Sequence, residues 1–285
     1  MRHILKAQPT LPIPQVIFKA QGFTVLEYID GNPIGSWNSL GMTEQTRHKL
    51  LRGLATFLHK LWTCPAPAAE TCVTAVTYKD WLLEEVDKAI CRSMQSSGWG
   101  HPISFVLRRA ILDSLVPRED CPWRAVRHGD MSALNVLMND DGLSGVIDWD
   151  TASFVPAPAA IQHPLFIADV PGLLHDNIPE GMTFADDRVY LEGAIRQQSA
   201  DASHIADLLA NSHERQFFEL SLRNKRINKE YIRLRLGAEE FDRVAARKQF
   251  DDFLMKNTWM ENHYAAKELR WQLCEIPHAA SYAVS

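Results

Sequence analysis

The sequence contains few cysteines and no pattern that would join them in a disulfide framework or a zinc site. Five cysteines are spread over 285 residues, and none belongs to a Cys-x-x-Cys pair. An odd number without such pairs argues against both kinds of site. We therefore expect reduced thiols, most of them buried as small apolar residues.

Long hydrophobic runs are also missing. No apolar run approaches the roughly 20 residues that a membrane helix needs. The segment from Met1 to Lys6 leads into proline-containing sequence and not into the apolar core of a secretory signal. The net charge of −5 gives no reason to expect nucleic-acid binding. These absences predict a cytoplasmic protein with neither a membrane nor a nucleic-acid partner.

The chain further lacks both glycine-rich patterns that wrap nucleotide phosphates. Neither Gly-x-Gly-x-x-Gly nor Gly-x-x-x-x-Gly-Lys-Ser/Thr occurs anywhere in it. What remains is ordinary globular composition, 46% hydrophobic and 23% charged. This is enough material for one large domain or two modest ones.

One stretch concentrates polar residues of the kind that carry chemistry. It runs from Arg127 to Asp150 and reads RHGDMSALNVLMNDDGLSGVIDWD. Asn135 follows Asp130 by five residues, and Asp148 follows Asn135 by thirteen. The stretch thus places two acids and an amide in a short part of the chain.

The residues between Asn135 and Asp148 predict a β-hairpin. Two short apolar runs, 136–138 and 143–147, flank the turn cluster Asn139-Asp140-Asp141-Gly142. A hairpin returns the chain to its starting point, so Asp148 is expected beside Asn135. Hard oxygen ligands of this kind suit Mg²⁺. Asp130 is then free to orient a hydroxyl proton, which is the division of labour that phosphoryl transfer needs.

The rest of the chain predicts a few strands followed by many helices. Residues 15–19 and 23–28 form two β-like runs, and residues 1–7 are typical of the end of a helix. Apolar residues at helical spacing predict helices over 43–62, 78–94, 102–116, 186–198, 201–220, 225–235 and 238–274. Residues 170–185 are expected to form a surface loop. The pattern predicts an α+β protein with a mostly helical lobe.

The order His128-Gly129-Asp130, Asn135 and Ile147-Asp148-Trp149 resembles the aminoglycoside phosphotransferase (choline-kinase-like) family of the protein-kinase-like fold. Two flanks agree with this resemblance. Residues 25–31 look like the hinge between the lobes of that family, and residues 57–61 resemble the end of its first large-lobe helix. Residues 154–156 and 163–172 resemble the fungal members in particular.

The resemblance implies a fold, a reaction and a role for each matching residue. It implies transfer of the γ-phosphate of ATP to the hydroxyl of an unidentified small molecule, with Mg²⁺. Asp130 would be the catalytic base, and His128 would brace its loop without reacting. Asn135 and Asp148 would hold Mg²⁺, and the backbone of Glu27, Tyr28 and Ile29 would meet the adenine. Asp150 would either assist the metal or cap its own loop.

The resemblance also implies a division of the chain. Residues 1–31 would be a truncated β-rich amino-terminal lobe with the hinge. Residues 32–285 would form the helical carboxy-terminal lobe, with the catalytic loop at 127–135. The match begins near the end of the helix that precedes the fourth strand of the small lobe. Exposed apolar surface is therefore expected where further strands would pack, and with it self-association.

Part of the machinery of this fold is not found in the sequence. The small lobe normally supplies a glycine-rich loop, a strand lysine and a helix glutamate that holds it. Lys6 and Lys19 lie outside the position of that lysine. Three interpretations stay open: a shortened phosphotransferase with impaired activity, a catalytically inactive pseudokinase-like remnant that acts as a binding module, and an unrelated metal-dependent hydrolase.

Overall fold

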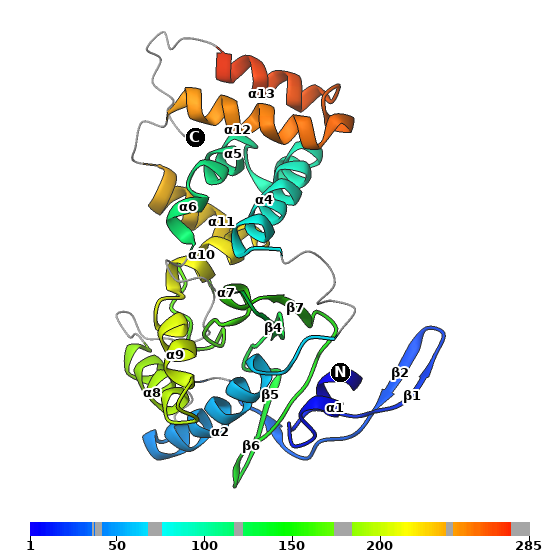
Figure 1. Cartoon of the computed structure of the whole chain (residues 1–285), viewed down its shortest axis with the longest axis vertical. Helices are drawn as coiled ribbons and strands as arrows, with labels where there is room; N and C mark the ends of the chain where they lie inside the picture. Colours follow the sequence, from blue (N-terminus) through cyan, green and yellow to red (C-terminus); the bar gives the residue numbers. More distant parts are fainter. Residues whose placement is uncertain are drawn as a thin grey trace. The chain divides into compact units, whose positions relative to one another are not determined.

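The computed structural model describes residues 1–35, 37, 42–67, 76–116, 122–173, 184–237 and 242–274 (Figure 1). The chain forms two compact units. The first consists of Met1–Tyr78 and Pro117–Phe217, and the second of Lys79–Val116 and Phe218–Ser285.

The first unit is built on three helices: α2 (Glu44–Trp62), α8 (Ala185–Arg196) and α9 (Ala202–Ala210). Helix α2 packs against α8, and α8 packs against α9. The Thr43 side chain caps α2, since its hydroxyl accepts the backbone N–H of Thr46 at 3.2 Å. The buried face of α2 carries the spacing that predicted the helix; its members are Leu50, Leu51, Leu54, Phe57, Leu58 and Leu61.

The described part of the first unit also contains three small antiparallel sheets and the short helices α1 (Arg2–Ala7) and α7 (Ala157–Ala160). Strand β1 (Val16–Ala20) pairs with β2 (Phe23–Leu26). Strand β5 (Val136–Asn139) lies between β3 (Asn32–Pro33) and β6 (Gly142–Val146). Strand β4 (Arg124–Arg127) pairs with β7 (Ser153–Pro156), and both contact α7. Helix α2 contacts β4 and β6, so it supports the strands that flank the predicted site.

The second unit is helical in its described residues. Its elements are α4 (Tyr78–Gln95), η1 (Ser97–Trp99), α5 (Ile103–Ala110), α6 (Leu112–Leu115), the end of α10 (His213–Ser221), α11 (Lys225–Tyr231), the π-helical turn η2 (Ile232–Leu236), α12 (Arg243–Lys256), η3 (Thr258–Met260) and α13 (Tyr264–Cys274). Helix α12 packs on α5 and α13. Its Phe250 and Phe253 are fully buried and stack on each other.

A buried arginine also lies in the core of the second unit. Arg108 is fully buried between the rings of Phe105 and Tyr231 and donates to the side-chain oxygen of Asn228 at 2.6 Å. Burial lowers its pKa to about 9.

Most predicted elements are confirmed. Helices are found close to 43–62, 78–94 and 186–198, and the strands near 15–19 and 23–28 form one hairpin. The prediction of single helices over 102–116, 201–220 and 238–274 was wrong. Each is interrupted, at Ile111, at 211–212 and at 257–263. The apolar periodicity continues across the breaks at Ile111 and 257–263 because the pieces on both sides bury residues in the second unit.

Other expectations had mixed outcomes. The thiols of Cys64, Cys91 and Cys274 are free, but only Cys64 is buried. Residues 174–183 of the expected loop and the tail from Pro277 lie outside the described residues. Among the described helices, none is both long and apolar enough to cross a membrane.

A buried histidine gives the first unit a pH dependence. His163 lies between Glu192 and Ser212, and burial lowers its pKa although the hydrogen bond to Glu192 raises it. The folded state therefore binds fewer protons than the unfolded state once the pH falls below about 6.5, the usual histidine pKa. The contribution of His163 to the free energy of unfolding is fully present above that pH and is lost as the pH falls.

We expect the urea midpoint of unfolding to be lower at pH 5.5 than at pH 7.5, with a smaller difference in His163→Gln. Glutamine keeps a polar side chain at this position but does not titrate. Circular dichroism at both pH values measures the two differences. Equal differences in the wild type and the variant would contradict this assignment.

Candidate functional site

The β5–β6 hairpin brings Asn135 and Asp148 to the same end of the sheet, as its sequence predicted. Val136 pairs with Val146, and Leu137 with Gly145. The pairing continues one residue beyond the strands, since the N–H of Ile147 donates to the carbonyl of Asn135 at 2.9 Å. Asp148 therefore leaves the hairpin beside Asn135.

His128 is joined to the same end of the hairpin. Its Nε2 lies 2.9 Å from the carbonyl oxygen of Ile147, and its Nδ1 accepts the backbone N–H of Asp130 at 3.3 Å. A carbonyl can only accept, so Nε2 carries the proton and the ring is held in one neutral tautomer. The ring is buried and meets Trp149 edge to face at 4.7 Å.

The environment of His128 keeps the ring neutral. Burial lowers its pKa, while the hydrogen bond to Ile147 and the charges of Asp130 and Asp148 raise it by less. Both ring nitrogens are already engaged with backbone groups. The ring therefore fixes the position of its loop and has no free nitrogen for proton transfer.

Asn135 connects the hairpin to Asp130. Its side-chain nitrogen donates to the backbone oxygen of Asp130 at 2.9 Å and to Oδ2 of the same residue at 3.1 Å. Both partners are acceptors, which fixes the orientation of the amide. Asn135 is buried, and its Oδ1 remains available as an acceptor. The Asp130 side chain is thus held through one carboxylate oxygen.

Asp148 has an unusual backbone. Its φ of 61° is the one positive φ of a non-glycine residue among the described residues. Left-handed backbone costs most side chains free energy, although aspartate tolerates it better than most. Asp148 is exposed, whereas the next residue, Trp149, is buried against His128. Asp150 is exposed again.

Three further residues support the loop, in roles that the sequence did not predict. The Thr151 hydroxyl donates to the carbonyl of His128 at 3.0 Å. The Trp149 indole donates to Val146 at 2.8 Å and packs on Phe57 of α2. Gly129 has a φ of +94°, and a Cβ there would lie 2.5 Å from the Thr151 hydroxyl. The glycine between His128 and Asp130 was the available signal.

The predicted adenine-binding residues lie in the linker between β2 and β3. Glu27 and Tyr28 are exposed, and the Glu27 N–H donates to Gln15, so this group is already paired. Ile29 packs on β6, where a Cβ on Gly145 would lie 2.7 Å from its side chain. None of the hydrogen bonds of the described site involves these three residues.

The donor set of the site is small. In the parts of the chain described above, no three His, Cys, Asp or Glu side chains gather as a metal site. The two predicted metal ligands are one amide, Asn135, and one acid, Asp148, so they would not form such a cluster. Both offer oxygen atoms, the donor type that Mg²⁺ prefers.

Comparison with solved structures identifies the class of this fold. The gentamicin complex of APH(2'')-IIa is 17% identical, with a TM-score of 0.56 over 89% of this chain and 77% of that one. ADP-bound aminoglycoside phosphotransferase APH(2'')-Ib is 16% identical, with a TM-score of 0.55 over 89% and 78%. A putative aminoglycoside phosphotransferase from Ralstonia eutropha is 14% identical, with a TM-score of 0.53 over 95% and 80%. The chain therefore has a protein-kinase-like fold.

The family follows from the sequence match. The model of the phosphotransferase enzyme family matches residues 1–157, more than half of the chain. The chain belongs to this family, which confirms the resemblance seen in the sequence. A search of curated proteins found no match.

We expect Gly129→Ala to lower the free energy of unfolding by about 1–3 kcal/mol, because the new Cβ meets Thr151 and the backbone is left-handed. Gly193 on α8 is the matched control, since a Cβ there meets nothing within 4 Å. Gly193→Ala should leave stability unchanged or raise it by about 0.5–1 kcal/mol. Urea unfolding measures both, and equal effects would contradict the crowding at Gly129.

Proposed function

We propose that the chain is a phosphotransferase that moves the γ-phosphate of ATP to the hydroxyl of a small molecule. Its family membership supports transfer of a phosphate. The names of proteins with similar folds support a nucleotide donor and a small-molecule acceptor, since one is bound to ADP and one to gentamicin. A third is a Plasmodium vivax ethanolamine kinase, which is 13% identical, with a TM-score of 0.50 over 88% of this chain and 70% of that one.

The observation that carries this proposal is the hydrogen-bonded pair of Asp130 and Asn135. Oδ2 of Asp130 is engaged by the Asn135 amide, which leaves Oδ1 to accept the proton of an incoming hydroxyl. Asp130 forms no ion pair with any described residue, so its charge is not neutralised locally. A carboxylate that is held on one side and free on the other can orient a hydroxyl for attack.

The proposed metal pair fits Mg²⁺. Asn135 presents Oδ1 because both hydrogen bonds of its amide nitrogen are made to Asp130. Asp148 presents an exposed carboxylate that makes no hydrogen bond or ion pair with any described residue. These two residues would hold Mg²⁺, which when bound neutralises charge on the phosphates. The role of Asp150 stays open between metal assistance and a local cap.

The nucleotide base is proposed to meet the linker at Tyr28 and Ile29. Neither backbone has a hydrogen-bond partner among the described residues, whereas the N–H of Glu27 is paired with Gln15. Tyr28 and Ile29 are therefore better candidates than Glu27 for hydrogen bonds to the base. We also propose a boundary at 31/32, with an amino-terminal segment and hinge before it and a helical lobe after it.

The proposed reaction is slow in the chain as it stands. Lys6 and Lys19 are exposed on α1 and β1 and take no part in the hydrogen bonds of the site. The loss of one positioned electrostatic donor costs about 10²–10³ in rate in well-studied enzymes. Impaired transfer with retained nucleotide binding is the expected state.

We expect Asp148→Ala to abolish Mg²⁺-dependent ATP binding, because it removes one of only two proposed metal ligands. Asp130→Asn should retain binding but lower phosphate transfer at least about 100-fold, because it removes the group that orients the hydroxyl. Calorimetric titration with Mg·ATP measures binding. ADP release over a panel of small hydroxyl compounds measures transfer.

Asp141→Ala is the matched control for both measurements. Asp141 is an exposed acid at the turn of the same hairpin, at the end away from Asn135. It should bind and react like the wild type. Binding that is equal in wild type and Asp148→Ala would exclude the metal pair. Mg·ATP binding without transfer to any compound would favour the alternative of a binding module.

The β1–β2 hairpin supports that alternative with an observation of its own. The strand register places Phe18 opposite Val25 and Ala20 opposite Phe23, on one face of the ribbon. Phe18, Phe23 and Val25 are 52%, 57% and 42% exposed, and this face carries no charge. A two-stranded ribbon is marginal alone. We propose that two copies associate through this face, which they can do without like-charge repulsion.

We expect Phe23→Lys to reduce concentration-dependent association, because it places a charge on the apolar face. Thr24→Lys adds the same charge at the next residue, on the opposite face, and should reduce association less. Sedimentation velocity over a range of concentrations measures both. A wild type that remains monomeric at all concentrations would contradict self-association.

A further inference from the structure

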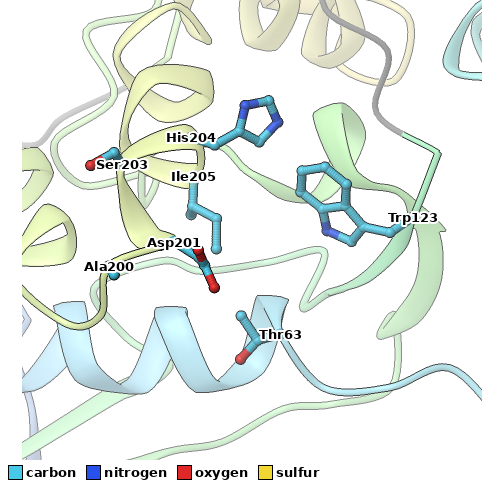
Figure 2. Close-up of a pocket in the computed structure, with 7 residues that line it drawn as sticks. All are labelled: Thr63, Trp123, Ala200, Asp201, Ser203, His204 and Ile205. Atoms are coloured by element: carbon cyan, nitrogen blue, oxygen red, sulfur yellow. The ribbon is translucent and has the colours of Figure 1, made fainter.

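A pocket outside the proposed catalytic site lies in the first unit, between the end of α2 and the start of α9. It has a volume of about 550 Å³ and is lined by Thr63, Trp123, Ala200, Asp201, Ser203, His204 and Ile205. This volume falls in the range of small-molecule sites, about 300–1,000 Å³. Figure 2 shows Trp123 across the pocket from Ile205 and Asp201, with Thr63 below them.

The pocket combines an aromatic wall with one negative charge. The rings of Trp123 and His204 lie 5.1 Å apart and are tilted by 55°. Ile205 adds a buried apolar side chain at the base. Among the described residues of the lining, Asp201 is the one acid, and none is a lysine or an arginine.

The charge of Asp201 is available to a ligand. Asp201 precedes α9, but its side chain makes no capping hydrogen bond to that helix. It also forms no ion pair with any residue that the structure describes. In contrast, Asp207 on the same helix is paired with Arg196 at 2.6 Å. The carboxylate of Asp201 therefore faces the pocket with no competing lysine or arginine among the described residues, and it disfavours an anion there.

The walls of the pocket are held in place by contacts outside it. Ser199, just before the pocket residues, hydrogen-bonds His59 of α2 at 3.2 Å. Helix α9 packs on α8, which packs on α2. Trp123 precedes β4, whose register with β7 is fixed over four residue pairs. The pocket is thus formed by elements that are positioned by the core of the first unit.

We propose that this pocket binds a small organic cation, an alkylammonium group with an apolar body. An aromatic face attracts an ammonium group, and a carboxylate at the rim adds charge attraction. Apolar carbon of the ligand packs on Ile205. Thr63 presents a hydroxyl that accepts an N–H where the ammonium carries one.

The site is separate from the proposed catalytic residues. Trp123 lies before β4 and His128 follows it, so the four residues of the strand intervene. At about 3.3 Å per residue they span roughly 13 Å. The proposal uses no residue of the Asp130 loop and stands or falls independently of the phosphotransferase function.

The test follows the indole N–H signal of Trp123 by ¹⁵N NMR of the full chain while tetramethylammonium chloride is added. Trp123→Phe assigns the signal among the eight tryptophans. The neutral isostere tert-butanol is added in a parallel titration, with sodium chloride keeping the ionic strength equal. We expect a saturable shift with tetramethylammonium and at least about threefold weaker binding of tert-butanol.

Two aspartate variants distinguish the effect of the charge in the pocket from a general effect of charge on this helix. Asp201→Asn should weaken tetramethylammonium binding at least about threefold, since it removes the charge and keeps the shape. Asp207→Asn makes the same change away from the pocket and should bind like the wild type. No shift, equal binding of both probes, or unchanged binding by Asp201→Asn would each overturn the proposal. Circular dichroism confirms that both variants are folded.

Discussion

The backbone of Ile147 is the point on which the proposed site depends. Its N–H donates to the carbonyl of Asn135, and its carbonyl accepts the Nε2–H of His128, so the backbone of one residue joins the hairpin to the loop that carries Asp130. Asp148 follows directly in the chain. A shift of the β5–β6 register by one residue would turn every side chain of the strand to the other face and separate these groups. The two strands therefore determine where the acids lie.

The core of the first unit holds the backbone of Ile147 in place. Trp149 packs between His128 and Phe57 of α2, and its indole donates back to Val146. Burial of the His128 ring keeps it neutral, so the ring can accept one backbone N–H and donate to one carbonyl at the same time. Asp148, whose φ is positive, is exposed directly before the buried Trp149.

The ordered site and the exposed β1–β2 hairpin belong to the same unit but differ in how they are supported. Strand β5 is paired on both edges and buries Val136 and Leu137, whereas among the described strands β1 and β2 pair only with each other, and they expose Phe18 and Phe23. The pocket at Trp123 lies at the opposite end of β4 from the catalytic loop. A single strand thus separates two regions of different chemistry, one with paired polar groups and one with an aromatic wall and a free carboxylate.

The sequence by itself determined the hairpin, the order of Asp130, Asn135 and Asp148, the family, and the helices whose apolar spacing is uninterrupted. These depend on local turn chemistry and on periodicity, which a single stretch of chain contains. The tertiary structure alone decided the pairing of β4 with β7, the breaks at Ile111 and 211–212, the roles of Trp149 and Thr151, and the pocket. These depend on contacts between residues far apart in the chain, and such contacts leave no periodic signal in either partner.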